Sequence, residues 1–116
     1  MIPDIKYNLH DSSITGVQIT PKSTVRFTID LYSVFHPNIK SIFLTFEKIF
    51  NYDSVSTYAQ KILDEAEPNE IGCRIDKFQY DTNKPSNLHD LWFYLATDWE
   101  GALRIHCESM SIEIIK

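Results

Sequence analysis

The C-terminal stretch, residues 88–115, contains two runs in which side chains alternate in character, and few folds accommodate it. In residues 91–96 the odd positions are apolar and the even positions carry mainly aromatic side chains, so both faces of the expected strand are apolar. A second alternation covers residues 103–114, and its phase slips by one residue near Ser109, as a β-bulge would produce. Because the turn-like residues 98–101 separate the two runs, the pattern predicts a long hairpin at or near the middle of an antiparallel sheet.

The size and composition of the chain predict one domain. A chain of 116 residues is long enough to bury a core of its own, and 43% hydrophobic residues exclude a disordered chain. With only 3 Gly and 5 Pro, neither a glycine-rich phosphate loop nor a long flexible linker is expected. Residues 1–116 are therefore expected to form a single domain.

Four more strands are expected before the hairpin. The most regular alternation runs from Thr24 to Tyr32, and further runs cover residues 39–46 and 71–80. Residues 14–19 also alternate, but their phase shifts at Gly16, which predicts a strand with a bulge.

The spacing of apolar residues changes between the strands expected at residues 39–46 and 71–80. From Val55 to Ala66 apolar side chains recur at the spacing of an amphipathic helix, which Asp53 or Ser54 is expected to cap and Pro68-Asn69 to end. The predicted order is β-β-β-α-β-β-β. The class is α+β, an antiparallel sheet of about six strands with one amphipathic helix packed on it.

The phases of these elements separate a predicted core from an outward aromatic set. The residues expected in the core are Val25, Phe27, Ile29, Leu44, Phe46, Ile62, Phe93, Leu95, Leu103 and Ile105. Phe43, Trp92 and Tyr94 lie opposite the main apolar rows of their strands. They indicate strong sheet curvature, a second packed layer or an exposed aromatic surface, and we take them as candidate partner-binding residues.

Charge points to a basic partner. The chain has 11 Lys and Arg against 16 Asp and Glu, a net charge of −5, which disfavours nucleic acids and anionic membranes. A cluster of carboxylates at the end of the predicted helix is a second candidate partner-binding surface; it comprises Asp64, Glu65, Glu67 and Glu70. With no apolar run of signal-peptide or bilayer-spanning length, the protein is expected in the cytoplasm.

The residues with reactive side chains give no catalytic signature. Cys73 and Cys107 lack zinc spacing and are in phase with apolar neighbours, so they are expected to be reduced core thiols; a bridge between adjacent strands is the alternative. The tetrapeptide Asn-Leu-His-Asp occurs at residues 8–11 and 87–90, before two hairpins of similar design. We expect a structural role at strand entrances, with a duplicated unit or catalysis as alternatives.

Neither metal nor cofactor is expected. The four histidines, His10, His36, His89 and His106, share no ligand spacing, and no nucleophile elbow is present. The two His-Asp pairs, His10-Asp11 and His89-Asp90, are the candidates for chemistry, but no convergent polar set accompanies them, so no catalytic residue is assigned.

Both ends of the chain resemble a pattern found in small, mostly uncharacterised bacterial proteins, some of them associated with toxin-immunity loci. The resemblance rests on the opening Leu-His-Asp-Ser-Ser-Ile at residues 9–14 and on the alternation at residues 103–113, and it does not cover the helix. It implies a cytoplasmic α+β protein that acts by binding a partner, and it transfers no catalytic residue.

Three functional hypotheses follow from the sequence. The first is a stoichiometric protein-binding module, in its sharpest form an immunity protein that neutralises a toxin. The second is a small-molecule binder or minor enzyme with a pocket between helix and sheet, lined by Tyr58, Phe78 and Trp92. The third is a structural homodimer.

Overall fold

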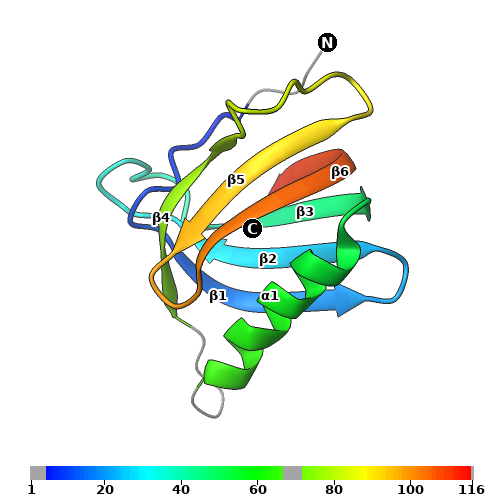
Figure 1. Ribbon diagram of the computed structural model, residues 1–116. Helices are drawn as coiled ribbons and strands as arrows, with labels where there is room; N and C mark the ends of the chain where they lie inside the picture. The colour runs from blue at the N-terminus through cyan, green and yellow to red at the C-terminus, as the bar shows by residue number, and fades with distance from the viewer. Residues whose placement is uncertain (1–4, 67–71, 116) are drawn as a thin grey trace.

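The computed structural model describes residues 5–66 and 72–115, which form six strands and one helix (Figure 1). The elements are β1 (Ser13–Thr20), β2 (Thr24–Asp30), β3 (Ser41–Ile49), α1 (Tyr52–Glu65), β4 (Cys73–Tyr80), β5 (Leu91–Thr97) and β6 (Gly101–Ile114). The predicted β-β-β-α-β-β-β order and α+β class are confirmed.

The sheet is closed on itself. Its strand order is β1-β2-β3-β6-β5-β4, every neighbouring pair is antiparallel, and β1 also pairs with β4. Closure gives the sheet the strong curvature that is one of the three arrangements left open by the outward aromatic residues. One surface of the sheet becomes the inside of a barrel and the other becomes its outside.

Strand β6 links the two halves of the barrel. Its first half, Gly101 to Cys107, pairs with β5, and its second half, Cys107 to Ile114, pairs with β3. Cys107 is paired on both sides, with Leu91 and with Ile49. The predicted C-terminal hairpin, placed in the middle of the sheet, is confirmed.

The predicted bulge at Gly16 is confirmed, whereas the one near Ser109 is wrong. The β1–β2 register shifts between Ile14 and Gly16, and a Cβ at Gly16 would lie 2.9 Å from the hydroxyl oxygen of Thr28. The β3–β6 ladder instead keeps one register throughout. On each strand the buried residues switch between even and odd positions near this point, from Phe46 to Ile49 on β3 and from Cys107 to Met110 on β6. Lys48, between Phe46 and Ile49, has a left-handed backbone with φ 51°.

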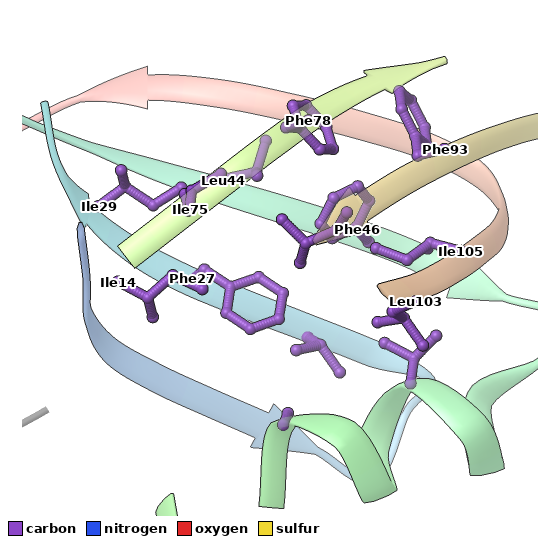
Figure 2. Close-up of a cluster of buried hydrophobic side chains, with 14 of the residues drawn as sticks. Ile14, Phe27, Ile29, Leu44, Phe46, Ile75, Phe78, Phe93, Leu103 and Ile105 are labelled. Atoms are coloured by element: carbon purple, nitrogen blue, oxygen red, sulfur yellow. The ribbon is translucent and has the colours of Figure 1, made fainter. Parts of the chain in front are cut away.

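Buried aromatic and aliphatic side chains fill the interior of the barrel. All ten predicted core residues are buried. Figure 2 shows side chains from facing strands directed toward one another, with the helix at one end of the cluster. The ring of Phe46 lies 5.5 to 6.2 Å from those of Phe27, Phe78 and Phe93. The barrel is therefore a packed core.

Helix α1 closes one end of this core. Its apolar stripe is buried at Val55, Tyr58, Ala59 and Ile62. The hydroxyl of Tyr58 donates to the carbonyl of Gly101 at 2.6 Å, and that of Tyr52 donates to the carbonyl of Thr20 at 2.5 Å. The helix therefore packs on the sheet as predicted, at the end where β1 stops and β6 begins.

The predicted start of the helix is wrong by two to three residues. The residue at the N-cap position is Asn51, so Asp53 and Ser54 lie in the first turn. The Asn51 side chain makes no capping bond. The predicted stop at Pro68-Asn69 lies outside the described residues.

Truncating Phe27 or Phe93 to alanine should lower the free energy of unfolding by about 3–5 kcal/mol, because each ring is fully buried and would leave a cavity. Chemical denaturation measures this loss. Phe35→Ala is the matched control, since that ring is 42% exposed and its loss should cost less than about 1 kcal/mol. Losses below about 1 kcal/mol at both buried positions would contradict the packing.

Candidate functional site

The outer surface of the β5–β6 hairpin carries two cross-strand pairs of large side chains. Trp92 lies opposite His106, and Tyr94 lies opposite Arg104. Because the neighbouring side chains Phe93 and Ile105 point into the core, these four must point outward. Trp92, Tyr94 and His106 are half-buried, and Arg104 is exposed.

Trp92 and His106 belong to a stacked row of four side chains on the outer surface. Lys84 and Phe50 are its two ends, and the order is Lys84, Trp92, His106, Phe50. The rings of Trp92 and His106 lie parallel, 4.0 Å apart between centroids and 11° apart in plane. The ring of Phe50 lies 4.6 Å from that of His106, and the Lys84 ammonium lies 5.1 Å from the Trp92 centroid. Since Phe50 follows β3 and Trp92 is on β5, the two rings reach His106 from opposite sides of β6.

The carboxylate of Asp90 orients the His106 ring. Nε2 of His106 donates a hydrogen bond to this carboxylate. Asp90 itself belongs to a tight turn, in which its amide donates to the carbonyl of Asn87 and its carbonyl accepts from the Asn87 amide. The stacked row is therefore held by backbone structure as well as by ring contacts.

A buried carboxylate binds Arg104 of the other pair and the loop that carries Lys84. The Asp81 side chain is only 2% exposed and accepts hydrogen bonds from Arg104 Nε at 2.8 Å and from the Asn83 amide at 3.0 Å. The hydroxyl of Ser86 accepts from the Trp92 amide at 2.9 Å. The two bonds to Asp81 are charge-assisted and satisfy its buried carboxylate. Together with the Ser86 bond they anchor the loop on the outer face.

Asn51 attaches the start of the helix to β6 beside the stacked row. Its Nδ2 donates to the carbonyl of Arg104 at 2.8 Å, and its Oδ1 accepts from the His106 amide at 2.9 Å. The Phe50 amide donates to the carbonyl of His106 at 2.7 Å. Asn51 thus uses its side chain to extend the sheet pairing, and this places Phe50 against His106.

The two predicted His-Asp pairs have different surroundings. Nδ1 of His10 donates to the carbonyl of Asp76 at 2.7 Å, and its Nε2 lies 3.5 Å from Asp11. Of the second pair, Asp90 binds His106, while Nδ1 of His89 lies 3.9 Å from Glu108. The leucines of the two tetrapeptides also differ, because Leu9 is 1% exposed and Leu88 is 51% exposed. The two segments are therefore not equivalent in the fold.

The histidines do not converge on a metal-binding arrangement in the described parts of the chain. Nε2 of His36 donates to the carbonyl of Asn8 at 3.0 Å. Among residues 5–66 and 72–115, no three His, Cys, Asp or Glu side chains are grouped so that they could hold a metal ion.

The predicted aromatic surface is divided into two places. Phe43 pairs with Glu113, whereas Trp92 pairs with His106, seven positions away along β6 or about 23 Å at the rise of a strand. The Arg26 guanidinium already lies 4.7 Å from the Phe43 centroid. Trp92 and Tyr94 therefore belong to the candidate site, and Phe43 does not.

The three aromatic residues predicted to line a pocket between helix and sheet are also separated. The Tyr58 side chain extends from the helix to the β5–β6 turn, Phe78 packs in the barrel, and Trp92 faces outward. An open groove of about 750 Å³ lies between residues 5–8 and 78–80; Phe78 is the one of the three that lines it, and Lys6 is its charged lining residue.

Half of the predicted acidic surface can be placed. Asp64 and Glu65 are exposed at the end of α1, and the Gln60 amide donates to Asp64 at 2.9 Å. Glu67 and Glu70 lie outside the described residues. In the part of the chain that the structure describes, no helix is both long and apolar enough to cross a bilayer.

Sequence reasoning missed Phe50, Lys84 and the His106–Asp90 pairing. Phe50 lies between the alternation that ends at Phe46 and the apolar stripe that begins at Val55, and a large apolar residue in such a connection is the sequence signal that could have marked it. The pairing of His106 with Asp90 has no such signal, since it depends on how β5 and β6 align.

Comparison of the chain with protein-family models, with curated proteins and with solved structures gives no match.

Replacing Asn51 with alanine should lower the free energy of unfolding by about 1–3 kcal/mol, because two hydrogen bonds to the β6 backbone are lost. Chemical denaturation measures the change. Asn38→Ala is the matched control in an exposed loop, with an expected change below about 0.5 kcal/mol. Equal losses in the two variants would show that Asn51 does not anchor the helix.

Cys73 and Cys107 should resist alkylation in the folded protein. Both thiols are free and buried, they lie on strands separated by β5, and burial raises the pKa of each from 9.0 to about 12. At about pH 8 we expect labelling more than about a hundredfold slower than in denaturant. Because the unfolded thiols ionise first, stability should fall as pH rises from 9.0 toward 12. Equal labelling rates would contradict this burial.

Proposed function

We propose that this protein is a stoichiometric protein-binding module whose binding surface is the outer face of the β5–β6 hairpin. The observation that carries the proposal is the stacked row, in which large side chains are held in fixed positions on the outside of the barrel. Since the interior is filled, binding must use the outer surface.

The composition of this face favours a protein partner. Trp, Tyr and Arg dominate the energetics of protein interfaces, and Trp92, Tyr94 and Arg104 lie together here. Asp81 binds Arg104, Ser86 binds the Trp92 amide, and Asp90 binds His106, on which Trp92 stacks, so much of this face is ordered before a partner arrives. A pre-ordered surface loses less conformational entropy on binding, so affinity is higher for the same contacts.

The specific form that we propose is a cytoplasmic immunity protein that neutralises a basic toxin. Three properties support it: the small size, the net charge of −5, and the resemblance of the two chain ends to proteins from toxin-immunity loci. Exposed carboxylates at Asp64 and Glu65 would steer a basic partner toward the protein.

The small-molecule and homodimer hypotheses have less support. The residues that would line a pocket between helix and sheet are separated, and the open groove at residues 5–8 and 78–80 does not include the stacked row. The contacts of the stacked row do not distinguish a second copy of this chain from another protein partner.

Replacing Trp92 with alanine should weaken the complex by about tenfold or more, because the ring is the centre of the stacked row. Partners would be captured from native-cell lysate, identified by mass spectrometry, purified, and titrated by calorimetry to obtain stoichiometry and Kd. Melting would first confirm that the variant folds. Phe35→Ala, on the exposed β2–β3 loop, is the control.

The acidic surface gives a second arm of the same experiment. Neutralising Asp64, Glu65, Glu67 and Glu70 to Asn or Gln should slow association, and the effect should fade with salt as exposed charges are screened. An unchanged Kd in the Trp92 variant would rule out the hairpin face. An unchanged association rate in the neutralised variant would rule out steering by the helix end.

A further inference from the structure

Three outward-facing aromatic rings differ in whether this chain supplies them with a cation. The Arg26 guanidinium lies 4.7 Å from the Phe43 centroid, and the Lys84 ammonium lies 5.1 Å from that of Trp92. Phe50 is 58% exposed, and in the described residues no cation of the chain stacks on its ring. The stacked row therefore has a cation at its Lys84 end and an open ring at its Phe50 end.

The open ring is held in place. The Phe50 amide donates to the His106 carbonyl, and its ring packs on the His106 ring at 4.6 Å. On the next residue, Asn51 binds the backbone of β6 in two places. A ligand stacking on Phe50 would thus meet a surface that is already ordered.

The charges around Phe50 favour a cation. Asp90 binds the His106 ring, Glu108 follows His106 two residues along the same face of β6, and Asp53 is exposed in the first turn of α1. Opposing them are Lys48, 3.6 Å from Glu108, and His89, 3.9 Å from it. Among these groups three carboxylates outnumber Lys48, the one cation that does not depend on protonation of a histidine, so the surroundings of Phe50 favour a positively charged group.

We propose that Phe50 is the docking platform for an arginine side chain of the protein partner, whose guanidinium stacks on the open ring beside the carboxylates of Asp90 and Glu108. Arginine fits better than lysine because its planar group stacks on an aromatic face and can bind a carboxylate through two N–H groups. A nucleobase could also stack here, but the negative charge of the chain opposes nucleic acid phosphates. This inference rests on the proposed protein-binding function and names the chemistry that the partner brings.

The test uses capped tripeptides as probes, acetyl-Gly-Arg-Gly-amide and its citrulline counterpart, which has nearly the same shape and no charge. Each is titrated into protein labelled with ¹³C in its aromatic rings, and shifts of the Phe50 and His106 ring signals are followed by NMR. We expect saturable shifts with the arginine peptide and an affinity about three- to tenfold above that of the citrulline peptide.

Two matched variants locate the effect. Phe50→Leu keeps an apolar side chain without the ring and should weaken arginine-peptide binding by about threefold or more, followed through the His106 ring. Phe43→Leu should leave it unchanged, because that ring is already covered by Arg26.

Equal affinities for the two peptides, an unchanged affinity in Phe50→Leu, or tighter binding of a single-stranded oligothymidylate at the same ring signals would each overturn the inference. Failure here leaves the proposed function standing if Trp92→Ala still weakens the purified complex. If Trp92→Ala has no effect, the proposed binding face itself is wrong.

Discussion

The hydrogen bonding of β6 to two different neighbours is the constraint on which the rest of the structure depends. Its first half pairs with β5 and its second half with β3, so one strand joins the N-terminal and C-terminal parts of the sheet. Pairing of β1 with β4 then completes the barrel. Closure removes most sheet edges and leaves one inner surface, which Phe46 and its neighbouring rings fill.

Because side chains fill the barrel interior, the surface that can contact another molecule is the outer one. The outer face of β5 and β6 carries side chains that could bind a partner, and buried or backbone-anchored groups position them. Asp81 is the main example, since its carboxylate is removed from water but bound by Arg104 and by the Asn83 amide. Such a group is stable only with its partners in place, so it fixes the loop as well as the arginine.

The beginning of the helix connects the core to this face. Asn51, in the connection between β3 and the helix, hydrogen-bonds the β6 backbone through its side chain. Tyr58 binds the same helix to the start of β6. Phe50 is held between a strand and a helix and cannot turn inward with either. Its exposure at the end of the stacked row therefore follows from the connection between two well-ordered elements.

The sequence by itself determined the strands, the helix and the core, because these depend on periods of two and 3.6 residues that local side chains display. The alternation of Val25, Phe27 and Ile29 was enough to place them inside. Only the tertiary structure decided that the sheet closes and that the phase change near Ser109 is shared with β3. It also decided that Asp90 hydrogen-bonds His106 and not its sequence neighbour His89. It also separated Phe43 from Trp92 and brought Phe50 to His106. These relations join residues far apart in the chain, and they are fixed by which strands become neighbours and in what register, which no local pattern encodes.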